Sequence, residues 1–516
     1  MCFDDACACP QRNDADKAWA CADFLCRGLR HPGFRCPNPD DDVSEKGLIY
    51  MAPRIRPNIV FMLLDNVGWG DWGCYGGQTP TPRIDALAAE GTRLTNYTVE
   101  PQCTPTRSAI LTGRLPVRSG TTQVPLLPKP YGLCPWEYTL ANLLSDAGYA
   151  TAAYGKWHLG ATEGRLPTDQ GFDEWWGLKN TTDEAGYTGY VAYRELLDSG
   201  FPLPLAIGMG VGESPKLWEA RKGEKAKATG DLDLEIRPFL DEKIVERATE
   251  YIARQAAANQ PFFAYIGFTH IHPPERVHPE FDRTAPHRLG LYADIIAEID
   301  HRVGQVLDAI DHAGIAEDTI VVLSSDNGTG GVVSVPGGSS GPWRGNFFTP
   351  PYEGSYRVPA IIRWPGHVPA GRVSNDMLAG LDWLPTLAGM LGESGRVPRD
   401  RPIDGLDASA FLTGQTEKSP RRYVALFGLD DQLMSVKVGY GKVVFRYTEG
   451  IDKPIVEPYF PQVFDLSSDP HEDYNLADTK MDCTWMLFLA GAVIADYQKS
   501  IEQYRNIETG EDFTGY

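Results

Sequence analysis

The chain has 516 residues, of which 48 are Lys or Arg and 69 are Asp or Glu, so its formal net charge is −21. Hydrophobic residues make up 42% and charged residues 23%, as in ordinary globular proteins, which excludes a disulfide mini-protein and a disordered chain. The negative net charge argues against nucleic-acid binding, because phosphate contacts need clustered Lys and Arg. It also argues against long anionic polymers as substrates. One basic pocket for a small anion remains compatible with it.

Residues 1–50 differ in composition from the rest of the chain. They hold six of the ten cysteines and are acidic, without the apolar stretch of a secretory signal peptide. No CxxC pair occurs there, so we predict a poorly ordered Cys-rich extension rather than a metal or disulfide knot. Translation that begins at Met51 is a second interpretation. The four remaining cysteines are too sparse for a disulfide framework, and with no transmembrane pattern they favour a cytoplasmic location.

From residue 57 the chain alternates strand and helix patterns. The apolar run Asn58–Leu64 predicts a strand buried on both faces. Thr81 and Pro82 predict the start of a helix that ends at Gly91, with Thr81 as the N-cap. Further predicted helices cover residues 138–147, 241–258, 290–313 and 382–391, and further strands cover 149–154, 262–269, 319–323 and 359–364. The Trp-, Tyr-, Gly- and Pro-rich stretch 160–230 has weak periodicity and is interpreted as long surface insertions.

This alternation predicts an α/β fold with a large, mostly parallel sheet flanked by helices. We expect a catalytic domain over residues 51–415. Residues 416–516 predict a smaller antiparallel α+β subdomain, with strands over 423–427, 434–438 and 442–447 and a final helix over 485–505.

Polar side chains follow three of the predicted buried strands. Asp65 and Asn66 follow the first strand, His270 and His272 follow the strand 262–269, and the pair Asp326-Asn327 follows the strand 319–323. Each pair by itself is also compatible with a turn or a helix cap. Because ligands of open α/β sheets bind at the carboxyl ends of strands, three such clusters indicate a site. Two Asp and two Asn offer oxygen ligands, which suit Ca²⁺ or Mg²⁺.

Cys103 opens the segment CTPTRSAILTGR, in which Arg107 follows four residues later. Such a cysteine is either a small core residue or, beside an arginine at a helix N-terminus, a nucleophile of lowered pKa. The segment resembles the motif C-x-P-x-R…T-G-R of type I sulfatases, in the alkaline phosphatase superfamily. Further segments that resemble this family are DNVGWGD from residue 65, GKWHLG from 155, THIHPP from 269, DNG from 326, YEGSYRVP from 352 and the FDL…DP…YNL region over 464–476.

The resemblance implies an alkaline phosphatase-like fold and a sulfuric ester hydrolase of the arylsulfatase type, acting on small or aryl sulfate monoesters. It implies that a separate formylglycine-generating enzyme oxidises Cys103 to formylglycine, whose hydrate attacks the sulfur atom. It also implies a divalent cation, with Ca²⁺ expected and Mg²⁺ or Mn²⁺ as alternatives. The metal ligands that it implies are Asp65, Asn66, Cys103, Asp326 and Asn327.

The same resemblance implies roles for the remaining site residues. Arg107 would orient the hydrate and Lys156 would stabilise the sulfate oxygens. His158 would assist release of sulfate, and His272 would contact the substrate and protonate the leaving oxygen. The expected partners are therefore a small sulfate ester and the maturation enzyme, and neither nucleic acid nor a membrane is expected. The sequence does not indicate the oligomeric state.

Two departures from the family pattern keep alternatives open. Asn66 stands where many members have Asp, which removes one negative charge from the metal site. Members commonly carry a sulfate-binding lysine before the YEGG segment; here that lysine is missing, and Arg344 or the Thr349 hydroxyl is the candidate substitute. A phosphonate or phosphate monoester hydrolase on the same site is one alternative, and an inactive sulfatase-like binding protein is another. Aromatic residues of the insertions suggest a pocket wall or ordinary core, namely Trp175, Trp176, Tyr187 and Tyr190.

Overall fold

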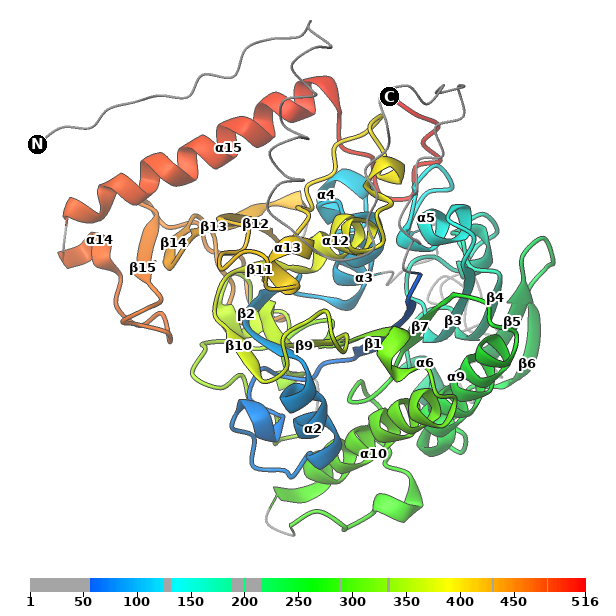
Figure 1. Cartoon of the computed structure of the whole chain (residues 1–516). Coiled ribbons are helices and arrows are strands. Elements are labelled where there is room, and N and C mark those ends of the chain that lie inside the picture. Colours follow the sequence, from blue (N-terminus) through cyan, green and yellow to red (C-terminus); the bar gives the residue numbers. More distant parts are fainter. Residues whose placement is uncertain are drawn as a thin grey trace, which may run out of the picture. The chain divides into compact units, whose positions relative to one another are not determined.

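The computed structural model describes residues 56–124, 131–187, 199, 215–286, 289–331, 335–428, 431–479 and 481–516. The extension predicted over residues 1–50 lies outside them. The described residues form two sheets (Figure 1). The large sheet has the strand order β10-β2-β9-β8-β1-β7-β3-β4-β5-β6, with β11 paired to β2, and the small sheet has the order β12-β13-β14-β15.

The centre of the large sheet is parallel, as predicted. β1 (Asn58–Leu64) lies between β7 (Phe262–Gly267) and β8 (Thr319–Ser325) and runs parallel to both. β3 (Ala150–Lys156) continues the parallel order beyond β7, and β4 (Glu174–Leu178) lies beyond β3. All residues of β1, β7 and β8 are buried, which explains why these strands are continuous apolar runs without alternation.

Antiparallel strands flank this centre. β9 (Arg357–Arg363) runs antiparallel to β8 and to β2 (Thr92–Thr98), and β10 (Arg372–Ser374) and β11 (Leu378–Ala379) run parallel to β2. On the other side, β5 (Lys216–Arg221) and β6 (Lys227–Asp231) continue the sheet from β4 in antiparallel order.

The prediction of surface insertions over 160–230 is therefore wrong for β4, which is buried within the sheet, whereas β5 is partly exposed and β6 is exposed along its length. Trp175 and Trp176 of β4 point to opposite faces of the sheet and are both buried in its cores. A strand covered on both faces lacks the polar-apolar alternation by which a strand is recognised, and this is the reason for the error. Both tryptophan side chains are thus ordinary core residues, one of the two interpretations of the sequence, and both also border a surface pocket. Tyr190 and the side chain of Tyr187 lie outside the described residues.

Helices cover both faces of the large sheet (Figure 1). One face packs against α2 (Pro82–Glu90), α9 (Leu240–Ala257) and α10 (Gly290–His312), and the other against α3 (Cys103–Thr112), α5 (Leu140–Asp146) and α12 (Trp383–Met390). Shorter helices are α4 (Pro116–Ser119), α6 (Glu184–Tyr187), α11 (Glu353–Tyr356), α13 (Ser409–Leu412) and α14 (Leu476–Thr479). Successive residues of β1 alternate between the two cores, as the period of two in a strand requires.

Thr81 precedes α2 as predicted, but its side chain does not cap the helix. Its hydroxyl instead donates to Asp85 Oδ1 at 3.0 Å and accepts the Gly73 N–H at 2.8 Å. The hydroxyl thus ties the first turn of α2 to the loop after β1.

The C-terminal part has the predicted antiparallel α+β architecture. Its strands are β12 (Tyr423–Phe427), β13 (Leu433–Val438), β14 (Gly441–Val444) and β15 (Gln462–Asp465). The long helix α15 (Trp485–Gln503) lies across one face of this sheet and shares its apolar core (Figure 1).

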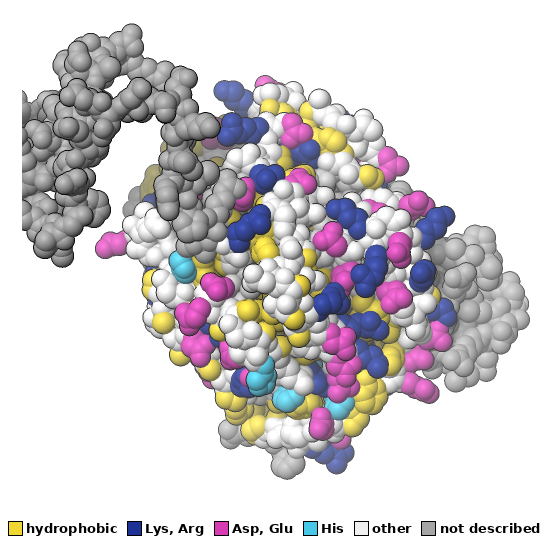
Figure 2. Space-filling model, turned by 45° about the vertical axis from the view of Figure 1, so that its right-hand side comes forward, with side chains coloured by type: hydrophobic (Ala, Val, Ile, Leu, Met, Phe, Trp, Pro, Cys, Tyr) yellow, Lys and Arg dark blue, Asp and Glu magenta, His cyan; other side chains and the backbone are white. Residues whose placement is uncertain are grey.

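The described surface carries charges of both signs, and three of the described cysteines form no disulfide bond. On the face shown in Figure 2, the described Lys and Arg side chains are interspersed with Asp and Glu. None of the described helices combines the length and the apolar character needed to cross a membrane. Cys74, Cys103 and Cys134 are free thiols.

Candidate active site

The carboxyl ends of β1 and β8 bring two acid-amide pairs together. Asp65 and Asp326 are fully buried. The Asp326 N–H donates to Leu64 O at 3.0 Å, and the Asn66 N–H donates to Asp326 Oδ1 at 3.3 Å. Asn66 has a φ of 62°, a left-handed conformation that Asn tolerates better than most residues. Asn327 Nδ2 donates to Asn66 Oδ1 at 2.6 Å, and besides burial the nearby Asp65 carboxylate raises the pKa of Asp326, so the two acid-amide pairs adjoin each other.

Cys103 is the first residue of α3 and is buried beside this cluster. Its Sγ donates to Asp65 Oδ1 at 3.6 Å. Ligand atoms of Cys103, Asp65 and His272 lie within 4.8 Å of one another. Burial and the nearby Asp326 raise the pKa of the Cys103 thiol well above its ordinary value. In the protein chain alone the pKa of this thiol is raised rather than lowered, because burial and the two carboxylates outweigh Lys156 and Arg107.

Two buried cations neutralise the two carboxylates. Lys156 Nζ donates to Asp65 Oδ2 at 2.7 Å, and Arg107 donates to Asp326 Oδ2 from Nη2 at 2.8 Å and from Nε at 3.1 Å. Arg107 also donates to Lys156 O at 2.9 Å, which joins α3 to β3. Burial opposes the charge on Lys156, but Asp65 raises its pKa, so the ammonium stays charged.

The predicted histidines both adjoin this charged cluster. His158 is buried, and its Nδ1 has no hydrogen-bond partner within the described part of the chain. Burial and the nearby Lys156 lower the pKa of His158 well below its ordinary value. The same two causes lower the pKa of His272 to about 4. Both rings are therefore neutral at pH 7 and able to donate a hydrogen bond to an anion.

His272 has neighbours that the sequence did not single out. Thr181 Oγ1 lies 3.1 Å from its Nε2, Thr182 Oγ1 lies 3.2 Å from its Nδ1, and Asp183 Oδ1 lies 3.7 Å from Nδ1. No local pattern points to these residues, because they come from a loop about 90 positions earlier in the chain. His270, two residues before His272, supports the site through its carbonyl, which accepts the Asp65 N–H at 3.0 Å.

The donor set suits a hard divalent cation. Asn327 Oδ1 is buried without a hydrogen-bond donor among the described residues, and an acceptor in that state needs a proton or a cation. With carboxylate and amide oxygens around it, the set matches the preference of Ca²⁺ or Mg²⁺. Lys156 and Arg107 already balance Asp65 and Asp326, so a dication would leave a positive surplus that favours an anionic ester.

The two candidate substitutes for the family lysine have other partners. Arg344 donates to Glu449 Oε1 at 2.9 Å and to Glu472 O at 3.1 Å. The Thr349 hydroxyl donates to Asn346 O at 2.7 Å and accepts the Asn346 N–H at 2.8 Å, which closes a local turn. Sulfate binding by either residue stays a prediction.

The YEGS segment has a structural partner in the C-terminal sheet. Glu353 accepts from Lys437 at 2.7 Å, from Lys442 at 3.1 Å and from Arg357 at 3.3 Å. Glu472 accepts the Glu353 N–H at 2.8 Å and pairs with Lys442 at 2.9 Å. This buried cluster ties α11, next to β9, to β13 and β14.

The fold and the site together define an α/β enzyme with a buried charged centre at the carboxyl ends of parallel strands. A family model described as "Sulfatase" matches residues 57–393. The chain is 33% identical to N-acetylgalactosamine-6-sulfatase of Canis lupus familiaris over 89% of each chain, and 34% identical to human arylsulfatase A over 81% of this chain and 83% of the relative. The crystal structure of PsFucS1 sulfatase from Pseudoalteromonas sp. is similar at a TM-score of 0.79 and 30% identity, over 88% of this chain and 92% of that chain.

The chain belongs to the sulfatase family, within the alkaline phosphatase-like superfamily. The family confirms the predicted enzyme class, an arylsulfatase-like hydrolase of sulfate esters. It also confirms the predicted fold class.

Proposed function

We propose that the protein hydrolyses sulfate monoesters through a formylglycine made from Cys103, with a divalent cation held by Asp65, Asn66, Asp326 and Asn327. The observation that carries the proposal is the place of Cys103. Its Sγ lies 3.6 Å from Asp65 Oδ1, on the first residue of α3 and beside the buried Lys156 and Arg107. A buried thiol of raised pKa is a weak nucleophile, whereas the hydrated aldehyde would supply a hydroxyl nucleophile.

The chain's own residues then have separate tasks. Lys156 and His158 would hold the sulfate oxygens, where negative charge must be stabilised in the transition state. Arg107 would orient residue 103, since its guanidinium is fixed by Asp326 and the Lys156 carbonyl. His272 would protonate the leaving oxygen. A divalent cation would supply charge stabilisation at this centre and favour ionisation of a bound hydroxyl group.

The names of the relatives suggest two substrate types for this site. Arylsulfatase A points to aryl sulfates, and N-acetylgalactosamine-6-sulfatase points to a sulfated sugar. We propose aryl sulfate monoesters as the first substrate to test, with N-acetylgalactosamine 6-sulfate as the second. The net charge of −21 for the whole chain disfavours a long anionic polymer as the substrate.

Mass spectrometry of the tryptic peptide that contains Cys103 tests the maturation step. The protein should be produced in cells that contain a formylglycine-generating enzyme and, as a control, in cells that lack it. The expected peptide is lighter by the difference between CH₂SH and CHO in the first host only. An unmodified thiol in an active protein from both hosts would contradict the proposal.

Kinetics on matched esters test the chemistry. We expect kcat/KM to be highest for para-nitrophenyl sulfate, compared with para-nitrophenyl phosphate and a para-nitrophenyl phosphonate monoester. A higher kcat/KM on the phosphonate or the phosphate would favour the alternative hydrolase, which uses the same nucleophile on another anion. Absence of turnover on every ester by a fully matured protein would favour the binding-protein alternative.

A further inference from the structure

A cavity lies beside α3, and its lining includes none of the residues of the catalytic cluster. Its volume is about 340 Å³. Thr106 and Ala109 line it from α3, whereas Cys103 and Arg107 face the catalytic cluster. The other walls come from β12, from α15 and from the loops around residues 379–381 and 403–406. The cavity thus lies between the helix of the nucleophile and the C-terminal subdomain.

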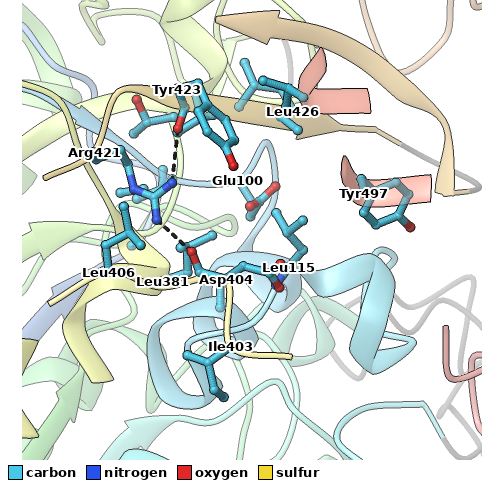
Figure 3. A pocket seen from close by; sticks show the side chains of 18 of the residues that line it. Glu100, Leu115, Leu381, Ile403, Asp404, Leu406, Arg421, Tyr423, Leu426 and Tyr497 are labelled. Atoms are coloured by element: carbon cyan, nitrogen blue, oxygen red, sulfur yellow. Dashed lines mark hydrogen bonds between the residues drawn. The ribbon is translucent and has the colours of Figure 1, made fainter. Parts of the chain in front are cut away.

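Glu100 is the unusual residue of this cavity. It is 6% exposed, and Figure 3 shows it in the middle of the lining residues. Its backbone is fixed by Thr106, whose Oγ1 accepts the Glu100 N–H at 2.9 Å. Its carboxyl group has no hydrogen-bond donor and no ion pair among the described residues, and burial raises its pKa to about 8. A buried carboxyl group without a partner costs free energy that a ligand can recover.

The other buried charges of the cavity are paired. Arg421 donates to Asp382 at 2.6 and 2.7 Å. It also donates to Asp404 O at 2.9 Å and to Tyr423 O at 3.1 Å (Figure 3). Arg118 donates to Asp404 Oδ2 at 2.9 Å. Asp496 lies on the exposed side of the cavity. Glu100 is therefore the buried acid of this lining that still needs a cation.

The rest of the wall near Glu100 is largely apolar. Leu115, Leu381 and Leu426 line it, together with the ring of Tyr497 (Figure 3). A volume of about 340 Å³ falls in the range of roughly 300–1,000 Å³ that small-molecule sites occupy. An apolar wall around one buried acid without a partner in the described part of the chain fits a molecule with an apolar body and one positive end.

We propose that this cavity is a second ligand-binding site, for a small organic cation with a primary ammonium group on an apolar body. The ammonium group pairs with the Glu100 carboxylate, which is the main form of this group only above its pKa of about 8, and the body packs against Leu115, Leu381 and Leu426. A charge-assisted hydrogen bond in a desolvated cavity is stronger than a neutral one. An amine is therefore preferred over an alcohol of the same shape.

Titration calorimetry of the full chain at a pH just above 8, where the Glu100 carboxyl group is ionised, tests the proposal with 2-phenylethylamine and with 2-phenylethanol as its neutral counterpart. We expect the amine to bind about tenfold or more tightly than the alcohol, the ratio that a difference of about 1.4 kcal/mol produces. Glu100→Gln should remove this preference, and Asp496→Asn, the matched change at an exposed acid of the same cavity, should keep it. Glu100→Met serves as a second neutral variant, so that a failure of the Gln variant to fold leaves the test intact.

The calorimetric result needs no turnover and is independent of the maturation of Cys103. Equal affinities for amine and alcohol, or no binding of the amine, would overturn the proposal. So would unchanged amine binding in both Glu100 variants, or a loss confined to Asp496→Asn. A crystal structure of the amine complex should place the nitrogen within hydrogen-bond distance of Glu100, and a position elsewhere would also overturn it.

Discussion

Neutralising Glu353 should strongly destabilise the protein. Its carboxylate is 1% exposed and accepts from Lys437, Lys442 and Arg357 at 2.7–3.3 Å. Glu353→Gln keeps the shape but leaves Lys437 and Arg357 without their carboxylate, whereas Lys442 retains Glu472. Breaking a buried ion pair costs about 3–5 kcal/mol. At roughly 2–4 °C for each kcal/mol in large domains, we expect the melting temperature to fall by about 6–20 °C.

The contribution of Glu353 to the free energy of unfolding should depend on pH in one direction. Burial opposes ionisation of Glu353, but Lys437 and Lys442 lower its pKa below the ordinary value. A group whose pKa is lowered by folding stabilises the folded state above its unfolded pKa, and this contribution disappears as the pH falls through the folded pKa. The difference between the wild-type protein and Glu353→Gln should therefore shrink as the pH falls below the ordinary glutamate pKa.

Thermal and urea unfolding measure this difference. The matched control is Glu457→Gln, which removes an exposed pair with Arg446 at 3.1 Å and should cost about 0–1 kcal/mol. In Glu353→Gln combined with Lys437→Met, part of the loss should return, because the unpaired buried ammonium is then absent. A loss in Glu353→Gln no larger than in Glu457→Gln would refute the reasoning.

Three further outcomes concern the active site. Cys103→Ala should abolish turnover with a melting temperature close to the wild-type value, since the change removes one small buried group; near-normal activity would contradict the assigned nucleophile. Asp326→Ala should lose bound divalent cation in elemental analysis as well as rate, while Asp308→Ala, at an exposed pair with Arg83, should keep both. His272→Ala should slow an alkyl sulfate more than para-nitrophenyl sulfate, because a good leaving group needs little proton transfer. For the alkyl ester, kcat/KM should fall as the pH rises above about 4, since the required acid is then deprotonated, and the variant should lose this dependence.

The sequence by itself determined the parallel centre of the sheet and the chemistry at its edge. Strands β1, β7 and β8 are buried on both faces, so each is a continuous apolar run that local reading detects. The polar residues after them, such as Asp65 and Asp326, stand out because they end such runs at the edge where ligands bind. The segment around Cys103 could also be recognised from the local sequence, because Cys103 and Arg107 lie close together in the chain, on the helix α3.

Only the tertiary structure decided which distant side chains complete these segments. The partners of His272 lie near residue 181, and those of Glu353 lie near residues 437 and 472. The free carboxyl group of Glu100 is unusual only because the chain around residues 381, 404 and 426 closes a cavity over it. Such contacts join segments that are far apart in the chain, and they depend on packing in three dimensions rather than on any local period of the sequence.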